Sequence, residues 1–117
     1  MSTKATIEGY FIDLEKKHDW TSYLSDGMVF TSYTSPIRRL SGKEEFLEST
    51  KPFYTMIAAM EVRLLIVEGE RACALTRYDL QPPGRPAFQS DVAEVFGVRD
   101  GQIVSFDIYF DSARFPK

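Results

Sequence analysis

The chain has 117 residues, of which 44% are hydrophobic and 14% aromatic, and its formal net charge at pH 7 is −3. This length suits a single domain over residues 1–117 with one hydrophobic core, and it leaves no room for a second core. Lysine and arginine are scattered along the chain, which argues against a nucleic-acid partner, because binding to phosphates needs clustered positive charge.

The N-terminal segment has the spacing of an amphipathic helix. Ile7, Tyr10, Phe11 and Leu14 fall at i, i+3, i+4 and i+7, which puts four apolar side chains on one helical face. The pattern predicts a helix over about residues 3–16. The few residues before it contain no apolar segment of the kind that a signal peptide needs, so we expect a cytoplasmic protein.

Two further helices and a strand are predicted before the strand-rich second half. Asp19 is a candidate N-cap for a short second helix. Residues 28–33 are mostly β-branched or aromatic and predict a strand. Ser41 and Glu44 fit a capping box, which predicts a third helix that Pro52 kinks or ends.

The second half of the chain has the pattern of strands joined by hairpins. Residues 81–86 contain three prolines and must form a loop, and Asp100-Gly101 is a strong hairpin signal. Cys73 lies in an apolar run without the partners of a disulfide or a zinc site, which predicts a small buried side chain and no bound metal. No apolar run approaches the length of a membrane span, so no membrane partner is expected. The predicted strands are 60–67, 71–80, 88–98 and 103–110.

Helices followed by an antiparallel meander predict an α+β fold. This order, and the ending Asp-Gly-Gln-Ile-Val-Ser-Phe-Asp-Ile-Tyr-Phe-Asp at 100–111, resemble the nuclear transport factor 2-like superfamily, in particular its SnoaL-like group, over nearly the whole chain. The resemblance implies a cone-shaped, curved antiparallel sheet, with three helices from the N-terminal half enclosing a pocket for a small apolar or aromatic ligand. It also implies a homodimer. Members include cyclases, isomerases and non-catalytic modules, so the fold alone does not define a reaction.

Two enzyme groups of this superfamily can be compared with the chain. Against ketosteroid isomerases, the general base falls on Ser32, the oxyanion-hole tyrosine on Phe11 and the oxyanion-hole acid on Glu94, of which only Glu94 keeps a usable group. A serine is a poor base without a partner histidine. Against limonene epoxide hydrolases, Arg77-Tyr78-Asp79 matches an Arg-x-Asp pair, but the second aspartate falls on Ile108. Two of the three isomerase positions and half of the hydrolase set are therefore missing.

Strand alternation suggests a polar cluster. If Arg77 and Asp79 point into the pocket, they face Glu94 on the next strand, and an arginine between two carboxylates is a self-consistent arrangement. Two interpretations stay open. The cluster is an ion-pair network at the rim, or it is a catalytic site in which Asp79 or Glu94 carries a proton and Arg77 sets the charge balance. In the same register, the side chains expected to point outward, toward a second copy of the chain, are Ala74, Thr76, Tyr78 and Tyr109.

The expected function is a small-molecule pocket without a cofactor. It performs acid–base chemistry on a small apolar substrate, or it is a non-enzymatic ligand-binding or dimerisation module with a degenerate site. The expected ligand-binding residues are Phe11, Trp20, Phe30, Ser32, Tyr33, Phe53, Met60, Phe96, Phe106, Ile108 and Phe110.

Overall fold

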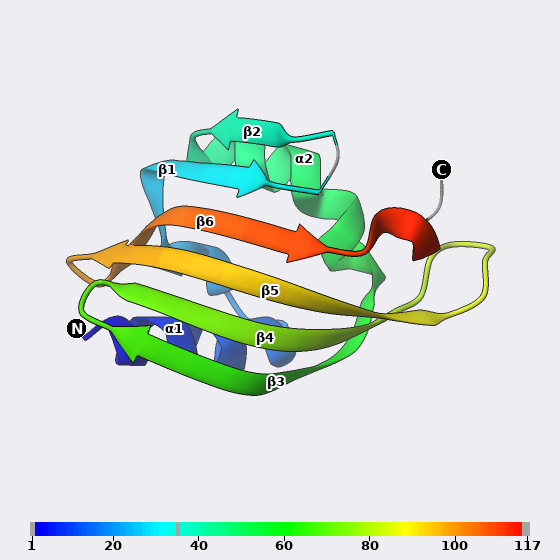
Figure 1. Ribbon diagram of the computed structural model, residues 1–117, viewed down its shortest axis with the longest axis horizontal. Helices are drawn as coiled ribbons and strands as arrows, with labels where there is room; N and C mark the ends of the chain where they lie inside the picture. Colours follow the sequence, from blue (N-terminus) through cyan, green and yellow to red (C-terminus); the bar gives the residue numbers. More distant parts are fainter. Residues whose placement is uncertain (1, 35, 116–117) are drawn as a thin grey trace.

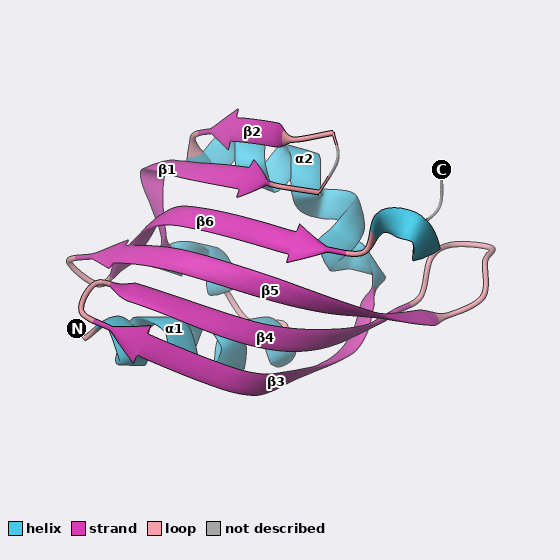
Figure 2. Cartoon of the chain, viewed as in Figure 1, coloured by secondary structure: helices cyan, strands magenta, loops and turns pink. Residues whose placement is uncertain are grey.

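A computed structural model describes residues 2–34 and 36–115 as two α-helices packed on one face of a curved, six-stranded sheet (Figures 1 and 2). The strand order is β2-β1-β6-β5-β4-β3. In chain order the elements are α1 (Thr3–Glu15), the 3-10 turn η1 (Trp20–Tyr23), β1 (Leu24–Ser32), β2 (Arg38–Ser41), α2 (Lys43–Met56), β3 (Ile57–Glu68), β4 (Arg71–Leu80), β5 (Phe88–Arg99), β6 (Gln102–Phe110) and the 3-10 turn η2 (Ser112–Arg114).

The two α-helices cover the same face of the sheet, at opposite ends of it. α1 contacts β3, β4 and β5, whereas α2 contacts β1 and β2. The Ser2 hydroxyl caps α1 by accepting a hydrogen bond from the Ala5 amide at 3.0 Å. The apolar face expected from the sequence is buried along α1, so the prediction of this helix is confirmed. Neither α-helix in the described part of the chain is long and apolar enough to cross a membrane.

The expected short second helix is present only as a 3-10 turn, with Asp19 at its N-cap position as expected, and the expected capping box is wrong. Residues 20–23 form a single 3-10 turn, because Leu24 already begins β1 and pairs with Ile103 of β6. Ser41 ends β2 and pairs with Val29, so its hydroxyl does not cap α2. The N-cap is Gly42, whose φ of +95° suits glycine and whose amide donates to the Met28 carbonyl at 2.7 Å.

The expected meander of β3 to β6 is confirmed, and β4 has the expected bounds of 71 and 80. Asp100 and Gly101 both have positive φ, as a two-residue hairpin turn requires. The sheet is nevertheless mixed, because β1 runs parallel to β6. The short strand β2 was not expected, since three of its four residues are polar.

Candidate functional site

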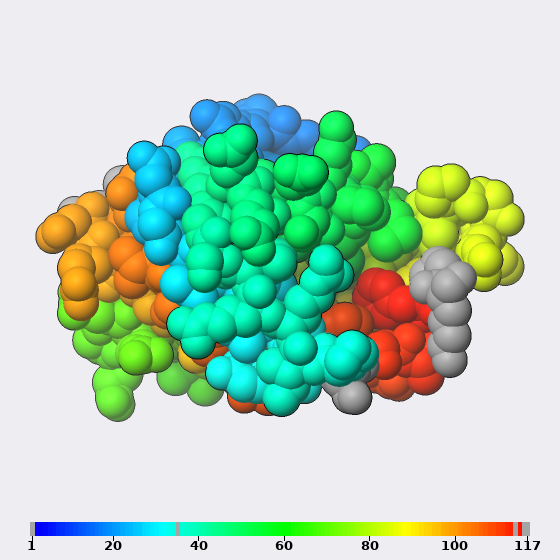
Figure 3. Space-filling model, turned by 90° about the horizontal axis from the view of Figure 1, so that it is seen from above, coloured from blue at the N-terminus to red at the C-terminus, as the bar shows by residue number. Residues whose placement is uncertain are grey.

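A cavity of about 430 Å³ lies between α2, the β1–β2 hairpin and the inner face of β4 to β6. Its mouth is bordered by residues on the hairpin, on α2 and on η2, which adjoin one another on the face shown in Figure 3. Aliphatic side chains also line it, among them Leu40, Val92 and Ile108. The aromatic rings that line it are Phe30, Phe53, Tyr54, Tyr78, Phe106, Phe110 and Phe115.

Glu94 contributes a carboxyl group to this mostly apolar wall, and only 2% of the residue is exposed. Its β5 position is paired with Ala74 of β4, whereas Tyr78 of β4 is paired with Ser90. The long Tyr78 side chain spans this offset on the inner face. Its hydroxyl donates to both Glu94 carboxylate oxygens, at 3.0 and 3.1 Å. The structure therefore joins a carboxyl group and a phenol at the inner end of the cavity.

Burial raises the pKa of Glu94 to about 7, because an ionised carboxylate is poorly solvated among aromatic rings. The hydroxyls of Thr76 and Tyr78 lower the pKa and only partly offset this effect. The Thr76 hydroxyl lies close enough to act on the carboxyl, although it forms no hydrogen bond of ordinary geometry. Burial and the neighbouring Glu94 charge raise the pKa of the Tyr78 phenol, which therefore stays protonated and able to donate.

A hydrogen-bonded pair of phenols also feels the charge of Glu94. The hydroxyls of Tyr10 on α1 and Tyr54 on α2 are 3.0 Å apart. Burial is the main cause that raises the pKa of both phenols, and the charge of Glu94 raises them further. Tyr10 is fully buried, and it lies next to the position where the family comparison expected an oxyanion-hole tyrosine, on Phe11.

Tyr54 also borders a second cavity, of about 460 Å³, between α1, η1, α2 and the start of β3. Trp20 lines this second cavity and stacks on Tyr54, with ring centroids 4.3 Å apart. Met60 lies in the same wall. The expected ligand-binding residues Trp20 and Met60 therefore border a different hollow from Glu94, with Tyr54 between the two.

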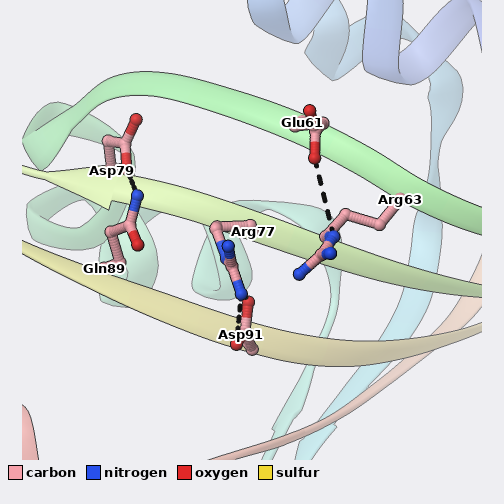
Figure 4. Close-up of polar contacts among 6 residues, drawn as sticks. All are labelled: Glu61, Arg63, Arg77, Asp79, Gln89 and Asp91. Atoms are coloured by element: carbon pink, nitrogen blue, oxygen red, sulfur yellow. Dashed lines mark hydrogen bonds and ion pairs between the residues drawn. The ribbon is translucent and has the colours of Figure 1, made fainter.

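The expected cluster of Arg77, Asp79 and Glu94 does not form. Arg77 lies on the outer face of the sheet, where its guanidinium donates to both Asp91 carboxylate oxygens, at 2.8 and 3.2 Å (Figure 4). Asp79 accepts a hydrogen bond from the Gln89 amide at 2.7 Å, also outside the cavity.

The reason for this difference is the charge pattern of β4. Its three charged residues all stand at odd-numbered positions and therefore share one face of the strand, so burying that face would desolvate all of them. The face formed by the even-numbered, uncharged residues points inward instead. Cys73, at an odd-numbered position, therefore lies half-buried on the outer face rather than in the core. The inward residues are Ala72, Ala74, Thr76, Tyr78 and Leu80, three of which were expected to point outward.

The other expected ligand-binding residues divide into three groups. Phe11 and Phe96 are buried and pack edge to face in the core, away from both cavities. Tyr33 is exposed and stacks on Tyr109 with centroids 5.0 Å apart. Those that line the cavity beside Glu94 are Phe30, Ser32, Phe53, Phe106, Ile108 and Phe110.

Sequence reasoning missed Tyr54 and Tyr78. The shared parity of the charges on β4 was a usable signal for Tyr78, because it marks the odd-numbered face as the solvated one. For Tyr54 the sequence offers little, because Pro52 lies inside α2, and the expectation that the helix kinks or ends there obscured which side chains beyond it face inward.

A sequence model of the SnoaL-like domain matches residues 10–106. Solved structures with the same fold include a protein from Kribbella flavida, with 20% identity and a TM-score of 0.81 over 95% of this chain and 88% of that one. A putative SnoaL-like polyketide cyclase from Jannaschia has 15% identity and a TM-score of 0.78, covering 93% and 85% of the two chains. An LEH-like epoxide hydrolase from M. tuberculosis has 20% identity and a TM-score of 0.76, covering 93% and 82%. Comparison with curated proteins gives no match.

Proposed function

The chain belongs to the SnoaL-like domain family, and on that premise we propose that its cavity binds a small, largely apolar molecule beside Glu94 and transfers a proton on it. The volume of about 430 Å³ is typical of a small-molecule site. Buried Glu94, the single acidic group in an aromatic wall, is the observation that carries the proposal.

The pKa of about 7 suits Glu94 to proton transfer, because both of its ionisation states are populated near neutral pH. In the proposed step, the carboxylate removes a proton from a carbon next to a carbonyl group and leaves an enolate, and the carboxyl group then returns a proton to that carbon. Between the two transfers the carboxyl proton can exchange with solvent, which is what exchange in D2O detects. Tyr78 orients the carboxylate by hydrogen bonding to both of its oxygens. This chemistry needs no cofactor and does not involve Arg77 or Asp79.

A second candidate function is ligand binding without catalysis. Ser32 and Ile108 line the cavity at positions where the related enzymes hold acidic residues, so a single carboxyl group would have to act alone. The two candidates predict different outcomes for the same experiment, described below.

We further propose that a second copy of the chain covers the outer face of the sheet. Leu64, Leu75, Ala93 and Tyr109 are paired in register across β3, β4, β5 and β6, and form a continuous row. Leu64, Leu75 and Tyr109 are 47%, 43% and 51% exposed. Covering such a row removes apolar surface from water. This row replaces the partner surface expected from the sequence, of which only Tyr109 points outward.

Proton transfer can be tested with small ketones such as cyclohexanone and 1-indanone. Trp20, the only tryptophan of the chain, stacks on Tyr54, so its fluorescence should change as the cavity fills. NMR in D2O should show that the wild type exchanges the α-hydrogens of a bound ketone, and Glu94→Gln should lower this rate by about 100-fold or more. Asp91→Asn, which removes a carboxylate on the outer face, is the control and should keep the rate.

Binding without exchange would favour the non-catalytic candidate. Failure of every small apolar compound to bind would overturn both candidates.

A further inference from the structure

Glu94 has no positively charged partner among the described residues. It takes part in none of the ion pairs of the described chain. The pKa of its carboxyl group is shifted by burial and by the hydroxyls of Thr76 and Tyr78, and both hydroxyls are neutral. Arg38, the other charged residue of the cavity, is exposed at the mouth. When Glu94 ionises, its charge is therefore left unbalanced in a poorly solvated place.

The hydrogen bonds of Glu94 also indicate what kind of group it can receive. The single Tyr78 proton is shared between both oxygens, at 3.0 and 3.1 Å, so both oxygens act as acceptors. A carboxylate has further lone pairs beyond the two that Tyr78 uses. A ligand group that donates several hydrogen bonds and carries positive charge complements this arrangement.

The aromatic wall favours the same kind of ligand. The face of an aromatic ring is electrically negative and attracts a cation, most strongly where water is excluded. Phe30, Phe53, Phe106 and Phe110 supply such rings around the cavity, and they also pack against a hydrocarbon body.

We propose that the ligand of this cavity is a small amine, whose ammonium group pairs with Glu94 while its hydrocarbon part packs among the aromatic rings. The inference rests on the binding part of the proposed function, because it names the class of molecule that fills the same cavity. It favours the candidate of ligand binding without catalysis, because a carboxylate paired with an ammonium group is not free to remove a proton from carbon. An ammonium group supplies both the missing positive charge and the several donors that the carboxylate can accept.

The affinity for such an amine should depend on pH through Glu94. The other titratable groups that face it are Tyr78 on β4, Tyr10 on α1 and Tyr54 on α2, and each is a phenol with a raised pKa that stays neutral. Arg38 lies exposed at the mouth of the cavity. The ammonium should bind more tightly above the pKa of Glu94, where the carboxyl is ionised, than below it.

Two probes of equal length separate charge from shape: 3-phenylpropylamine and 3-phenylpropanol, titrated by calorimetry into the whole chain. At about pH 8, the amine should bind wild type at least about tenfold more tightly than the alcohol, and at about pH 5.5 this advantage should disappear. Glu94→Gln should weaken amine binding by about tenfold and alcohol binding by less than about threefold. Asp91→Asn, the same change on the outer face, should alter neither affinity.

Equal affinity for the two probes at both pH values would overturn the inference and leave the proposed function in place. Unchanged amine affinity in Glu94→Gln would also overturn it. Should Glu94→Gln fail to fold, the pH dependence of wild type decides alone. If neither probe binds, the inference is overturned. The proposed function then fails as well only if the small ketones do not bind either.

Discussion

Glu94 is a residue that the fold holds at a cost in stability. Its pKa of about 7 lies above the ordinary value of 4.5, because burial disfavours the ionised form. The unfolded chain releases this proton between the two values while the folded chain retains it. The folded state therefore binds more protons, and stability falls as the pH rises through that window.

We expect wild type to lose about 3 kcal/mol of unfolding free energy through Glu94 between about pH 4.5 and pH 7. In Glu94→Gln this loss should be absent, because the amide does not titrate. Urea melts of both proteins at about pH 5 and pH 8 measure the difference, and other titrating groups cancel in the comparison.

Arg77→Met is the matched control for this measurement. Arg77 pairs with Asp91 on the outer face, so its removal should leave the pH profile of wild type intact. A profile flattened by Arg77→Met would mean that Arg77 and Glu94 are coupled after all. An equal change of stability between the two pH values in wild type and in Glu94→Gln would show that Glu94 ionises as freely in the folded chain as in the unfolded one.

At the scale of elements, Gly9 allows η1 to pack against α1. A Cβ built at Gly9 would lie 2.5 Å from the Tyr23 hydroxyl oxygen and 2.8 Å from the ring carbon that bears it. Glycine is a poor helix former, and its presence inside α1 is explained by this close approach.

Gly9→Ala should therefore destabilise the protein by about 1–2 kcal/mol, although alanine is the better helix former. In a Tyr23→Ser background the ring is gone, and the same change should stabilise by about 0.5–1 kcal/mol. Gly27→Ala is the control, because a Cβ there meets nothing within 4 Å. Thermal melts of the four-member cycle test this reversal of sign, and a stabilising Gly9→Ala in the wild-type background would contradict it.

The elements that could be predicted from the sequence are those with local signals. Asp100-Gly101 is enough to predict the β5–β6 turn, and the apolar face of α1 can be recognised from the spacing of its own residues. The pairing of β1 with β6 joins residues about 75 positions apart, so no local pattern indicates it. Arg38–Ser41 becomes a strand because β1 offers it an open edge, not because of its composition.

The candidate site was predicted only in part, and the reason is the period of a strand. Because side chains alternate between the two faces of a sheet, choosing the wrong inward-facing residue on a strand assigns every side chain of that strand to the wrong face. The match of Arg77 and Asp79 to a catalytic pair favoured the wrong parity for β4, whereas Glu94 on β5 was assigned to the inner face, as observed. The Tyr78 contact to Glu94 depends on both strands at once and could not be predicted from either alone.

At the scale of the whole molecule, the uncovered apolar row on the outer face bears on assembly. The row crosses four strands, and Tyr33 extends it by stacking on Tyr109. The salt bridge between Arg77 and Asp91 lies beside the row and adds a polar margin. An apolar centre with a polar border is the composition of many protein–protein interfaces.

We expect a dimer at micromolar concentration, and Leu75→Glu should convert it to monomer because it places a charge in the centre of the row. Ile12→Glu is the control, since Ile12 is 52% exposed on α1, away from this face. Sedimentation velocity of wild type and both variants distinguishes the cases. Wild type that is monomeric throughout, or a dimer that survives Leu75→Glu, would exclude this interface.

The place of β6 in the sheet also determines when the protein can take shape during its synthesis. Among the described strands, β6 is synthesised last, yet it lies between β1 and β5 and is the one that hydrogen-bonds to both halves of the sheet. Until it emerges, the β1–β2 hairpin and the β3–β5 meander are separate pieces with open edges, which are prone to pair with other chains. The wall that surrounds Glu94 needs Phe106, Ile108 and Phe110 from that strand, so a nascent chain has no complete ligand cavity until β6 has emerged.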